Sequence, residues 1–297
     1  MLLGGLFWGI LGDRLGRLRI LFGSILIYSL ANIANACVWD LNSYAAIRFI
    51  AGLGLAGELG AGITLISEIM DKNRRGYGTM IVVTFGALGA VVAYLVADLG
   101  DNWQLSYWVG GLMGLALLVL RLGTLESGMY KQAVASKVSR GKVWMLFNSP
   151  QRFLRYMACI CLGLPVWFAV GVLVNLSVNY FDPIFQFKGG IETGPAVMYC
   201  YIGLSIGDLL AGLFSQWFRS RLKVIGAYLM LCAAVCYVYF FESKGADANF
   251  FYGLTFMLGI GTGYWALFVT VAAEQFGTNI RSTVANTVPN MVRGAVV

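Results

Sequence analysis

The sequence has no histidine, only five prolines and few charged residues. Of its 297 residues 12% are charged and 59% are hydrophobic, whereas a soluble domain is about 25% charged. Without histidine there is no imidazole for a general base or for a zincin-type metal motif. The six cysteines lack the CxxC spacing of a metal site, so we expect them to pack as small apolar residues. The chain also shows no obvious nucleophile–base pair. We therefore expect a membrane protein that is not an enzyme and holds no metal or cofactor.

Eight apolar runs approach the ~20 residues that cross the hydrocarbon of a bilayer. Each is expected to form one spanning helix, and two shorter runs lie at the chain ends. The chain therefore looks truncated at both ends, and it lacks the charged start and cleavage site of a signal peptide. The eight runs are Ile20–Cys37, Tyr44–Met70, Thr79–Leu99, Tyr107–Leu122, Arg155–Tyr180, Pro195–Trp217, Val224–Phe241 and Phe250–Ala273, and the end runs are Leu2–Leu11 and Val284–Val297.

The basic residues gather on one side of these runs. All but four of the 21 Lys and Arg fall in alternate loops, and such loops are cytoplasmic by the positive-inside rule. The exceptions are Lys188 and Lys244 in the opposite loops and Arg48 and Arg293 inside runs. The net charge of +7 is thus a topology signal and not a sign of nucleic-acid binding. We expect a multi-pass protein of the bacterial inner membrane with the Thr124–Phe153 loop in the cytoplasm.

The long polar stretch divides the chain into two parts that resemble each other. It predicts an N-terminal helix bundle (1–122), a cytoplasmic linker (123–153) and a C-terminal bundle (154–297). Glu68 and Arg75 are seven residues apart, as are Glu274 and Arg281, and the same offset of 206 places Gly57 on Gly263. Matches in the same order favour a parallel internal repeat, which is typical of transporters.

The segment GILGDRLGRLR, Gly9–Arg19, lies between two apolar runs and is dense in glycine and charge. It resembles the G-x-x-x-D-R-x-G-R-[KR] loop of the major facilitator superfamily, between the second and third helices. Arg48 with Gly52, Gly54 and Gly57 resembles the fourth-helix signature, and the two Glu/Arg pairs are similar to those of the sugar-porter-like branch. Leu18 stands where the superfamily usually has a basic residue. LESGMY (Leu125–Tyr130) only partly matches the superfamily's motif at the end of the sixth helix.

This resemblance implies an all-α polytopic membrane protein built from two pseudo-symmetric six-helix bundles. The visible runs correspond to helices two to eleven, with the first and last helices missing. The resemblance also implies that charges at the helix ends close the cytoplasmic side in one state and release it in the other. The residues of this predicted cytoplasmic gate are Gly9, Asp13, Arg14, Gly16, Arg17, Glu68, Arg75, Glu274 and Arg281.

Ionisable side chains inside the apolar runs are candidates for substrate and proton binding, because such groups are costly near the bilayer centre. Glu58 has mostly small helical neighbours and is our candidate to take up a proton in one conformation and release it in the other. Arg48 and Arg293 could pair with a substrate carboxylate. Asp208 is a further candidate, or part of a latch in the second half. Polar and aromatic side chains that suit a polar solute complete the set: Trp167, Asn175, Asn179, Tyr264 and Trp265.

The sequence thus predicts a secondary active transporter for a small polar or anionic metabolite, driven by a proton gradient through symport and working by alternating access. Its expected partners are a small-molecule substrate and the lipid bilayer, and it is expected to be a monomer. One alternative is a proton-coupled exporter of the same superfamily, although Thr79–Leu99 lacks the proline of the usual exporter hinge. A second alternative is a non-transporting sensor on a carrier fold.

Overall fold

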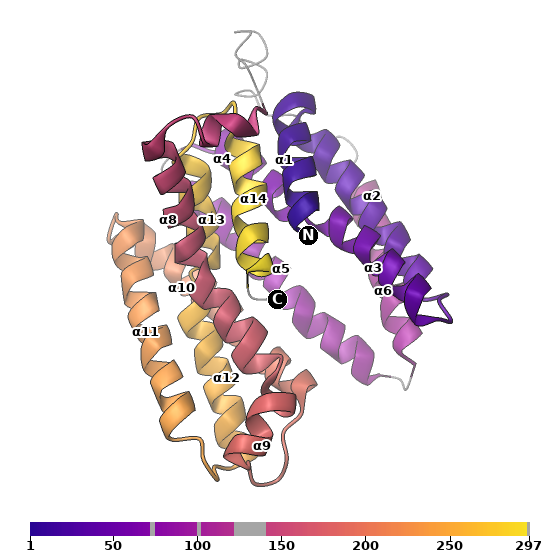
Figure 1. Cartoon of the computed structure of the whole chain (residues 1–297), viewed down its shortest axis with the longest axis vertical. Helices are drawn as coiled ribbons and strands as arrows, with labels where there is room; N and C mark the ends of the chain where they lie inside the picture. Colours follow the sequence, from indigo (N-terminus) through magenta and orange to yellow (C-terminus); the bar gives the residue numbers. More distant parts are fainter. Residues whose placement is uncertain (72–74, 100–101, 122–140, 296–297) are drawn as a thin grey trace. The chain divides into compact units, whose positions relative to one another are not determined.

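The computed structural model describes residues 1–71, 75–99, 102–121 and 141–295. The described residues form helices and no strand (Figure 1). The first part contains α1 (Leu2–Leu15), α2 (Arg17–Asn35), α3 (Leu41–Leu55), α4 (Glu58–Ile69), α5 (Arg75–Asp98) and α6 (Trp103–Leu120). After residue 140 follow η1 (Val143–Leu146), α8 (Pro150–Trp167), η2 (Phe168–Val174), η3 (Ser177–Phe181), α9 (Asp182–Phe185), α10 (Thr193–Trp217), α11 (Arg221–Phe241), α12 (Ala248–Thr262), α13 (Trp265–Glu274) and α14 (Arg281–Gly294).

Eight stretches of the described residues are long and apolar enough to cross a membrane. They coincide with the eight apolar runs of the sequence, which confirms the prediction of an all-helical polytopic fold. The stretches are Arg17–Asn35, Leu41–Ile69, Gly76–Asp98, Trp103–Leu120, Pro150–Val174, Thr193–Trp217, Arg221–Phe241 and Ala248–Glu274.

Three of the runs expected to be single helices are interrupted. The run Arg155–Tyr180 changes from α-helix to π-helical turns after Trp167. Pro165 lies just before this change, and proline removes one backbone donor from a helix. The hydroxyl of Tyr239 donates to the carbonyl of Leu173 at 2.8 Å. A side chain thus supplies a partner to a backbone group in the irregular segment, as the bilayer interior requires.

The other two interruptions lie at equivalent places of the internal repeat. α3 ends before Gly57 and α12 ends before Gly263, at the offset of 206. Both glycines allow a close approach, because a Cβ on Gly57 would lie 2.6 Å from Cγ of Trp8, and one on Gly263 would lie 2.5 Å from the carbonyl carbon of Gly207. The repeat in sequence is therefore also a repeat of half-helices.

The chain folds into two compact units that do not follow the order of the sequence. The first contains the described residues of Met1–Arg75, Leu95–Ile160 and Val269–Gly294. There α1 packs along α14, from the opposite end of the chain, and the two ribbons lie side by side (Figure 1). The second unit contains those of Gly76–Tyr94 and Cys161–Phe268. The division into bundles on either side of the linker stays a prediction.

Small residues bring helices together in the second unit. α10 and α12 form its most extensive helix pair. A Cβ on Gly207 would lie 2.6 Å from the carbonyl oxygen of Ile260, and one on Gly259 would lie 2.8 Å from the amide nitrogen of Leu204. Close backbone packing through glycine is characteristic of membrane helices, because lipid chains provide no hydrophobic force between them.

Candidate functional site

Within the charged segment Gly9–Arg19, the turn between the two helices is a single residue. α1 ends at Leu15 and α2 begins at Arg17, so Gly16 alone reverses the chain. Its φ of 106° is in the region that favours glycine. Gly9 serves a different purpose, since a Cβ there would lie 2.9 Å from Cα of Thr283 in α14. Glycine therefore shapes the turn and also lets α14 approach α1.

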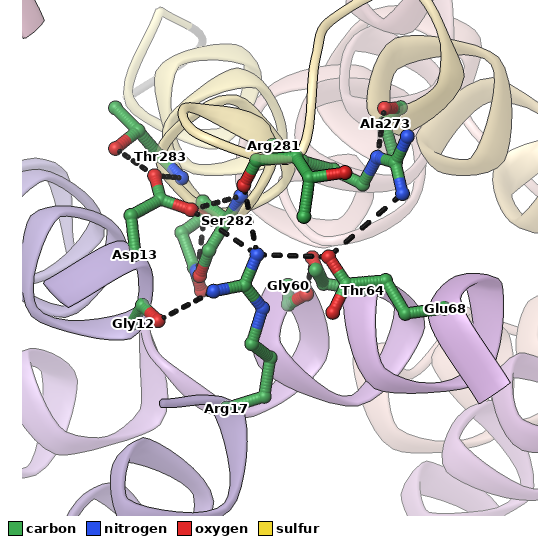
Figure 2. Close-up of polar contacts among 12 residues, drawn as sticks. Gly12, Asp13, Arg17, Gly60, Thr64, Glu68, Ala273, Arg281, Ser282 and Thr283 are labelled. Atoms are coloured by element: carbon green, nitrogen blue, oxygen red, sulfur yellow. Dashed lines mark hydrogen bonds and ion pairs between the residues drawn. The ribbon is translucent and has the colours of Figure 1, made fainter. Parts of the chain in front are cut away.

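Asp13, in the last turn of α1, caps the N-terminus of α14. Its Oδ1 accepts a hydrogen bond from the backbone nitrogen of Ser282 at 3.0 Å, and its Oδ2 accepts bonds from the nitrogen of Thr283 at 2.9 Å and from its hydroxyl at 2.6 Å (Figure 2). A carboxylate here complements the positive end of the helix dipole. Asp13 is fully buried, and burial raises its pKa to about 6, although Arg17 and the hydrogen bonds from Thr283 and Ser282 oppose the rise.

Arg17 lies between two carboxylates. Its Nη2 donates to Oε1 of Glu68 at 2.8 Å, and Oδ1 of Asp13 is 3.5 Å away. The same guanidinium donates to the carbonyl of Gly12 at 2.9 Å and to that of Thr278 at 3.0 Å. The side chains of Arg17, Glu68 and Asp13 are fully buried. Several hydrogen bonds per charge are what a buried ion pair needs to offset its desolvation.

Arg281 brings the second copy of the Glu/Arg repeat into this network. Its Nη1 lies 3.8 Å from Oε1 of Glu68, and its Nε donates to the carbonyl of Ala273 at 3.1 Å (Figure 2). The arginine of one repeat thus contacts the glutamate of the other. We define the ionic network as Asp13, Arg17, Glu68 and Arg281.

The sequence predicted a gate formed by charges at helix ends, and it did not predict that these charges are buried. The ionic network is buried where α14 packs against α1 and α4. Arg14 is exposed, and Glu274 is half-buried in the last turn of α13. The side chain of Arg75 lies outside the described residues.

Glu58 is the first residue of α4, directly after the break at Gly57. The sequence had placed it in the middle of a continuous helix. Its carboxylate lies 3.9 Å from the guanidinium of Arg121, and both side chains are about one third exposed. Arg121, which the sequence counted among the loop cations, is thus near Glu58. Glu58 does not belong to the ionic network.

Arg48 lies on the exposed surface of α3 against two aromatic rings. Its guanidinium carbon is 5.9 Å from the ring centre of Tyr44 and 5.7 Å from that of Tyr107. The hydroxyls of these two tyrosines are 2.9 Å apart. A cation over aromatic faces is held by the ring quadrupole, and this holds the guanidinium of Arg48 beside two rings that meet edge to face.

Asp208 caps the second half-helix, within the second unit. It is fully buried, and its Oδ1 accepts a hydrogen bond from the nitrogen of Ala266, in the first turn of α13, at 2.9 Å. Tyr228 stabilises the same region, since its hydroxyl donates to the carbonyl of Gly207 at 2.9 Å. The geometry thus gives Asp208 a clear structural contact at the start of α13.

Among the remaining candidates, Trp167 contacts Trp265, which follows Tyr264 in the sequence. Tyr264 is fully buried, and its hydroxyl donates to the carbonyl of Leu162 at 2.8 Å, while Trp265 packs edge-on against Trp167 with ring centres 6.0 Å apart. Asn175 and Asn179 are exposed and lie on the π-helical segment. Arg293 is half-buried in the last turn of α14.

Sequence reasoning missed the polar face of α14. The run Val284–Val297 was interpreted as an apolar helix cut short, but α14 buries a series of hydroxyl and amide side chains. They recur at the helical spacing of four residues, a signal that the sequence contained. They are Ser282, Thr283, Asn286, Thr287 and Asn290.

An all-helical membrane protein with paired half-helices and buried ions at its helix termini has the architecture of a membrane transporter. The family model of the Major Facilitator Superfamily matches residues 1–294, so the chain belongs to this superfamily. The resemblance found in the sequence is thereby confirmed, and the protein is a multi-pass membrane transporter and not an enzyme.

Curated relatives are similar over most of the chain. The niacin transporter NiaP of Acinetobacter baylyi is 26% identical over 95% of this chain and 70% of its own length. The 3-(3-hydroxy-phenyl)propionate transporter of Escherichia coli is 30% identical over 71% of this chain and 52% of its own length. Among solved structures, the proton:xylose symporter XylE has the same fold, with a TM-score of 0.72 at 17% identity, over 99% of this chain and 75% of that chain.

Proposed function

We propose that the protein is a secondary active transporter that moves a small organic acid together with a proton by alternating access. The ionic network is the observation that carries this proposal. Its members come from α1, α2, α4 and α14, so a movement of α14 would separate them. The network therefore suits a gate that is closed in this arrangement.

The energetics of buried ions support a reversible gate. In the closed arrangement the network exchanges hydration for ion pairs and hydrogen bonds, and such an exchange is often close to neutral in free energy. When α14 moves away, water solvates the same charges. Two arrangements of similar free energy are what a ligand or a proton needs in order to shift the population from one to the other.

Two features favour an organic acid as the substrate. Arg48 lies beside the rings of Tyr44 and Tyr107, which would suit a carboxylate attached to an aromatic ring. The substrates named for two relatives, niacin and 3-(3-hydroxy-phenyl)propionate, are both small aromatic carboxylates. We infer that the substrate of this protein belongs to the same chemical class, with Arg48 or Arg293 as the anion partner.

Glu58 is the proposed proton carrier. Its partial exposure gives water access to the carboxylate, and Arg121 at 3.9 Å would favour the charged form until substrate or movement weakens the pair.

Placement in the bacterial inner membrane, a cytoplasmic position of residues 124–153 and the monomeric state stay predictions.

The test is uptake into proteoliposomes with an imposed pH gradient, acid outside. Labelled niacin, 3-(3-hydroxy-phenyl)propionate and xylose are compared. We expect uptake of at least one aromatic acid that collapses when a protonophore is added, and none of xylose. Glu58→Gln should abolish the pH-driven uptake, while Glu242→Gln, at an exposed glutamate outside the spans, should leave it unchanged. Uptake that ignores the pH gradient, or that survives in Glu58→Gln, would reject proton symport through Glu58.

A further inference from the structure

We propose that Asn290 is a positioning residue that couples Glu58 to the gate. Its amide ties the break between α3 and α4 to α14, the helix that Asp13 caps. This proposal rests on the proposed function and adds a residue to it. The sequence analysis singled out neither Asn290 nor Ala56.

The observation is a hydrogen bond between helices at the break. Nδ2 of Asn290 donates to the carbonyl of Ala56 at 3.0 Å and to the carbonyl of Asn286 at 2.7 Å. Ala56 is the C-cap of α3, Gly57 follows, and Glu58 begins α4. A broken helix leaves backbone carbonyls without the partners that a continuous helix would provide. Asn290 supplies such a partner two residues before Glu58.

Asn286 provides a natural comparison one turn earlier on the same helix. Its Nδ2 donates to the carbonyl and hydroxyl of Ser282 at 2.9 and 3.3 Å, so its hydrogen bonds stay within α14. Asn286 and Asn290 are both buried, and within the described part of the chain neither Oδ1 has a hydrogen-bond partner. The two amides therefore share burial and an unsatisfied oxygen, and differ in the bond to Ala56.

A buried amide with an unsatisfied oxygen raises the free energy of the packed state. A leucine would fill such a position without that penalty. Unlike leucine, Asn290 has an Nδ2 donor, and this donor forms the hydrogen bond to the carbonyl of Ala56, at the break before Glu58. We infer that its contribution is to hold the start of α4, and with it the carboxylate of Glu58, in a fixed relation to α14.

α14 carries both contacts along one helix, in which Pro289 precedes Asn290. Asp13 holds its first turn at Ser282 and Thr283, and Asn290 lies about 12 Å further along, at 1.5 Å per residue. A displacement of α14 that opens the ionic network also withdraws Asn290 from Ala56. Conversely, a change at Glu58 that moves the start of α4 acts on α14 through the same bond, as thermodynamic coupling requires.

The experiment is a double-mutant cycle read by cysteine alkylation. Val288, which is fully buried on α14, is replaced by the smaller cysteine as a reporter of α14 exposure. The exposed cysteines Cys37 and Cys161 are replaced by serine, and the same protein without the reporter gives the background. Glu58→Gln is then introduced into four versions of the full chain, which are the parent, Asn290→Ala, Asn290→Leu and Asn286→Ala.

We expect Glu58→Gln to raise the alkylation rate about fivefold in the parent, the low end of typical coupling, because loss of the charge weakens the pair with Arg121. The same rise is expected in Asn286→Ala. In Asn290→Ala, the rise in alkylation rate caused by Glu58→Gln should fall below about 1.5-fold. The same result is expected in Asn290→Leu, a second variant that packs better than alanine. The difference between the rise in the parent and the rise in these variants measures the coupling. A stability loss alone would raise all rates and leave the response intact.

Two results would overturn the proposal, and they can be told apart. An equal response to Glu58→Gln in the parent and in both Asn290 variants would show that Asn290 carries no coupling, while the proposed function stands. No response in the parent would show that Glu58 is not linked to α14. In that case the proteoliposome assay of Glu58→Gln decides separately whether proton symport through Glu58 also fails.

Discussion

Removing one partner of the Arg17–Glu68 pair should destabilise the protein far more than removing both. In Glu68→Leu the guanidinium of Arg17 keeps its bonds to backbone carbonyls and the carboxylate of Asp13 at 3.5 Å, but it loses the hydrogen-bonded carboxylate at 2.8 Å, and Arg281 loses its neighbour at 3.8 Å. Removing one partner of a buried ion pair costs ~3–5 kcal/mol, which is about 10²–10⁴ in the unfolding equilibrium.

The double variant Arg17→Met/Glu68→Leu removes both charges of this pair, while Asp13 and Arg281 keep their hydrogen bonds to the backbone. It gives up the two hydrogen bonds from Arg17 to backbone carbonyls, at about 1 kcal/mol each, but it fills the site with apolar side chains. We expect a net cost of at most ~2 kcal/mol, because apolar replacement of buried pairs is often neutral or stabilising. Asp13 still accepts the hydrogen bonds of Ser282 and Thr283 in this variant.

The assay is unfolding by increasing SDS in mixed micelles, with the free energy taken from the fluorescence transition. Glu242→Gln, at an exposed position, serves as the control and should stay within ~0.5 kcal/mol of the parent. If the double variant loses as much as the sum of the two single variants, Arg17 and Glu68 do not act as a pair, and the energetic basis of the proposed gate is refuted.

Three further results are expected. Gly259→Ala, whose Cβ would lie 2.8 Å from the nitrogen of Leu204, should cost at least ~1–3 kcal/mol in the SDS assay, whereas Gly253→Ala on the same helix, with open space at its Cβ, should gain ~0.5–1 kcal/mol; equal effects would contradict the packing. Asp208→Ala should cost ~0.5–2 kcal/mol as a lost cap, and Asp208→Asn less, because the amide oxygen can still accept. The pKa of Asp13 is raised from 3.8 to about 6, so the folded state favours the protonated form; the stability of the parent relative to Asp13→Asn should fall by up to ~3 kcal/mol as the pH rises from 4 to 6, and a constant difference would contradict this.

The spans and the repeat could be predicted from the sequence because their causes are local or periodic. Long apolar runs lie where the bilayer requires them, and the offset between Gly57 and Gly263 survives as a break in both helices. What the sequence could not show is that these glycines interrupt a helix. A glycine in an apolar run is compatible with a continuous helix, and only the neighbours at Trp8 and Gly207 reveal the close approach.

The partners within the candidate site were harder to predict than its members. Asp13, Arg17 and Glu68 were candidates because their motif resembles a known one. The residues that Asp13 contacts, Ser282 and Thr283, lie about 270 positions away and carry no charge. Every residue has a backbone nitrogen, so neither composition nor spacing shows which helix start Asp13 contacts. A tertiary contact of this kind can be identified only from the structure.

The hydrogen bond from Asn290 to Ala56 also sets a schedule for biosynthesis. The two residues are 234 positions apart, and a ribosome adds about 5–20 residues per second. The carbonyl of Ala56 is therefore made about 10–50 seconds before its amide partner exists. During that interval the carbonyl of Ala56 must be hydrogen-bonded by water, by the translocon or by a temporary neighbour, and α3 and α4 gain this contact with α14 only when almost the whole of this chain has been made.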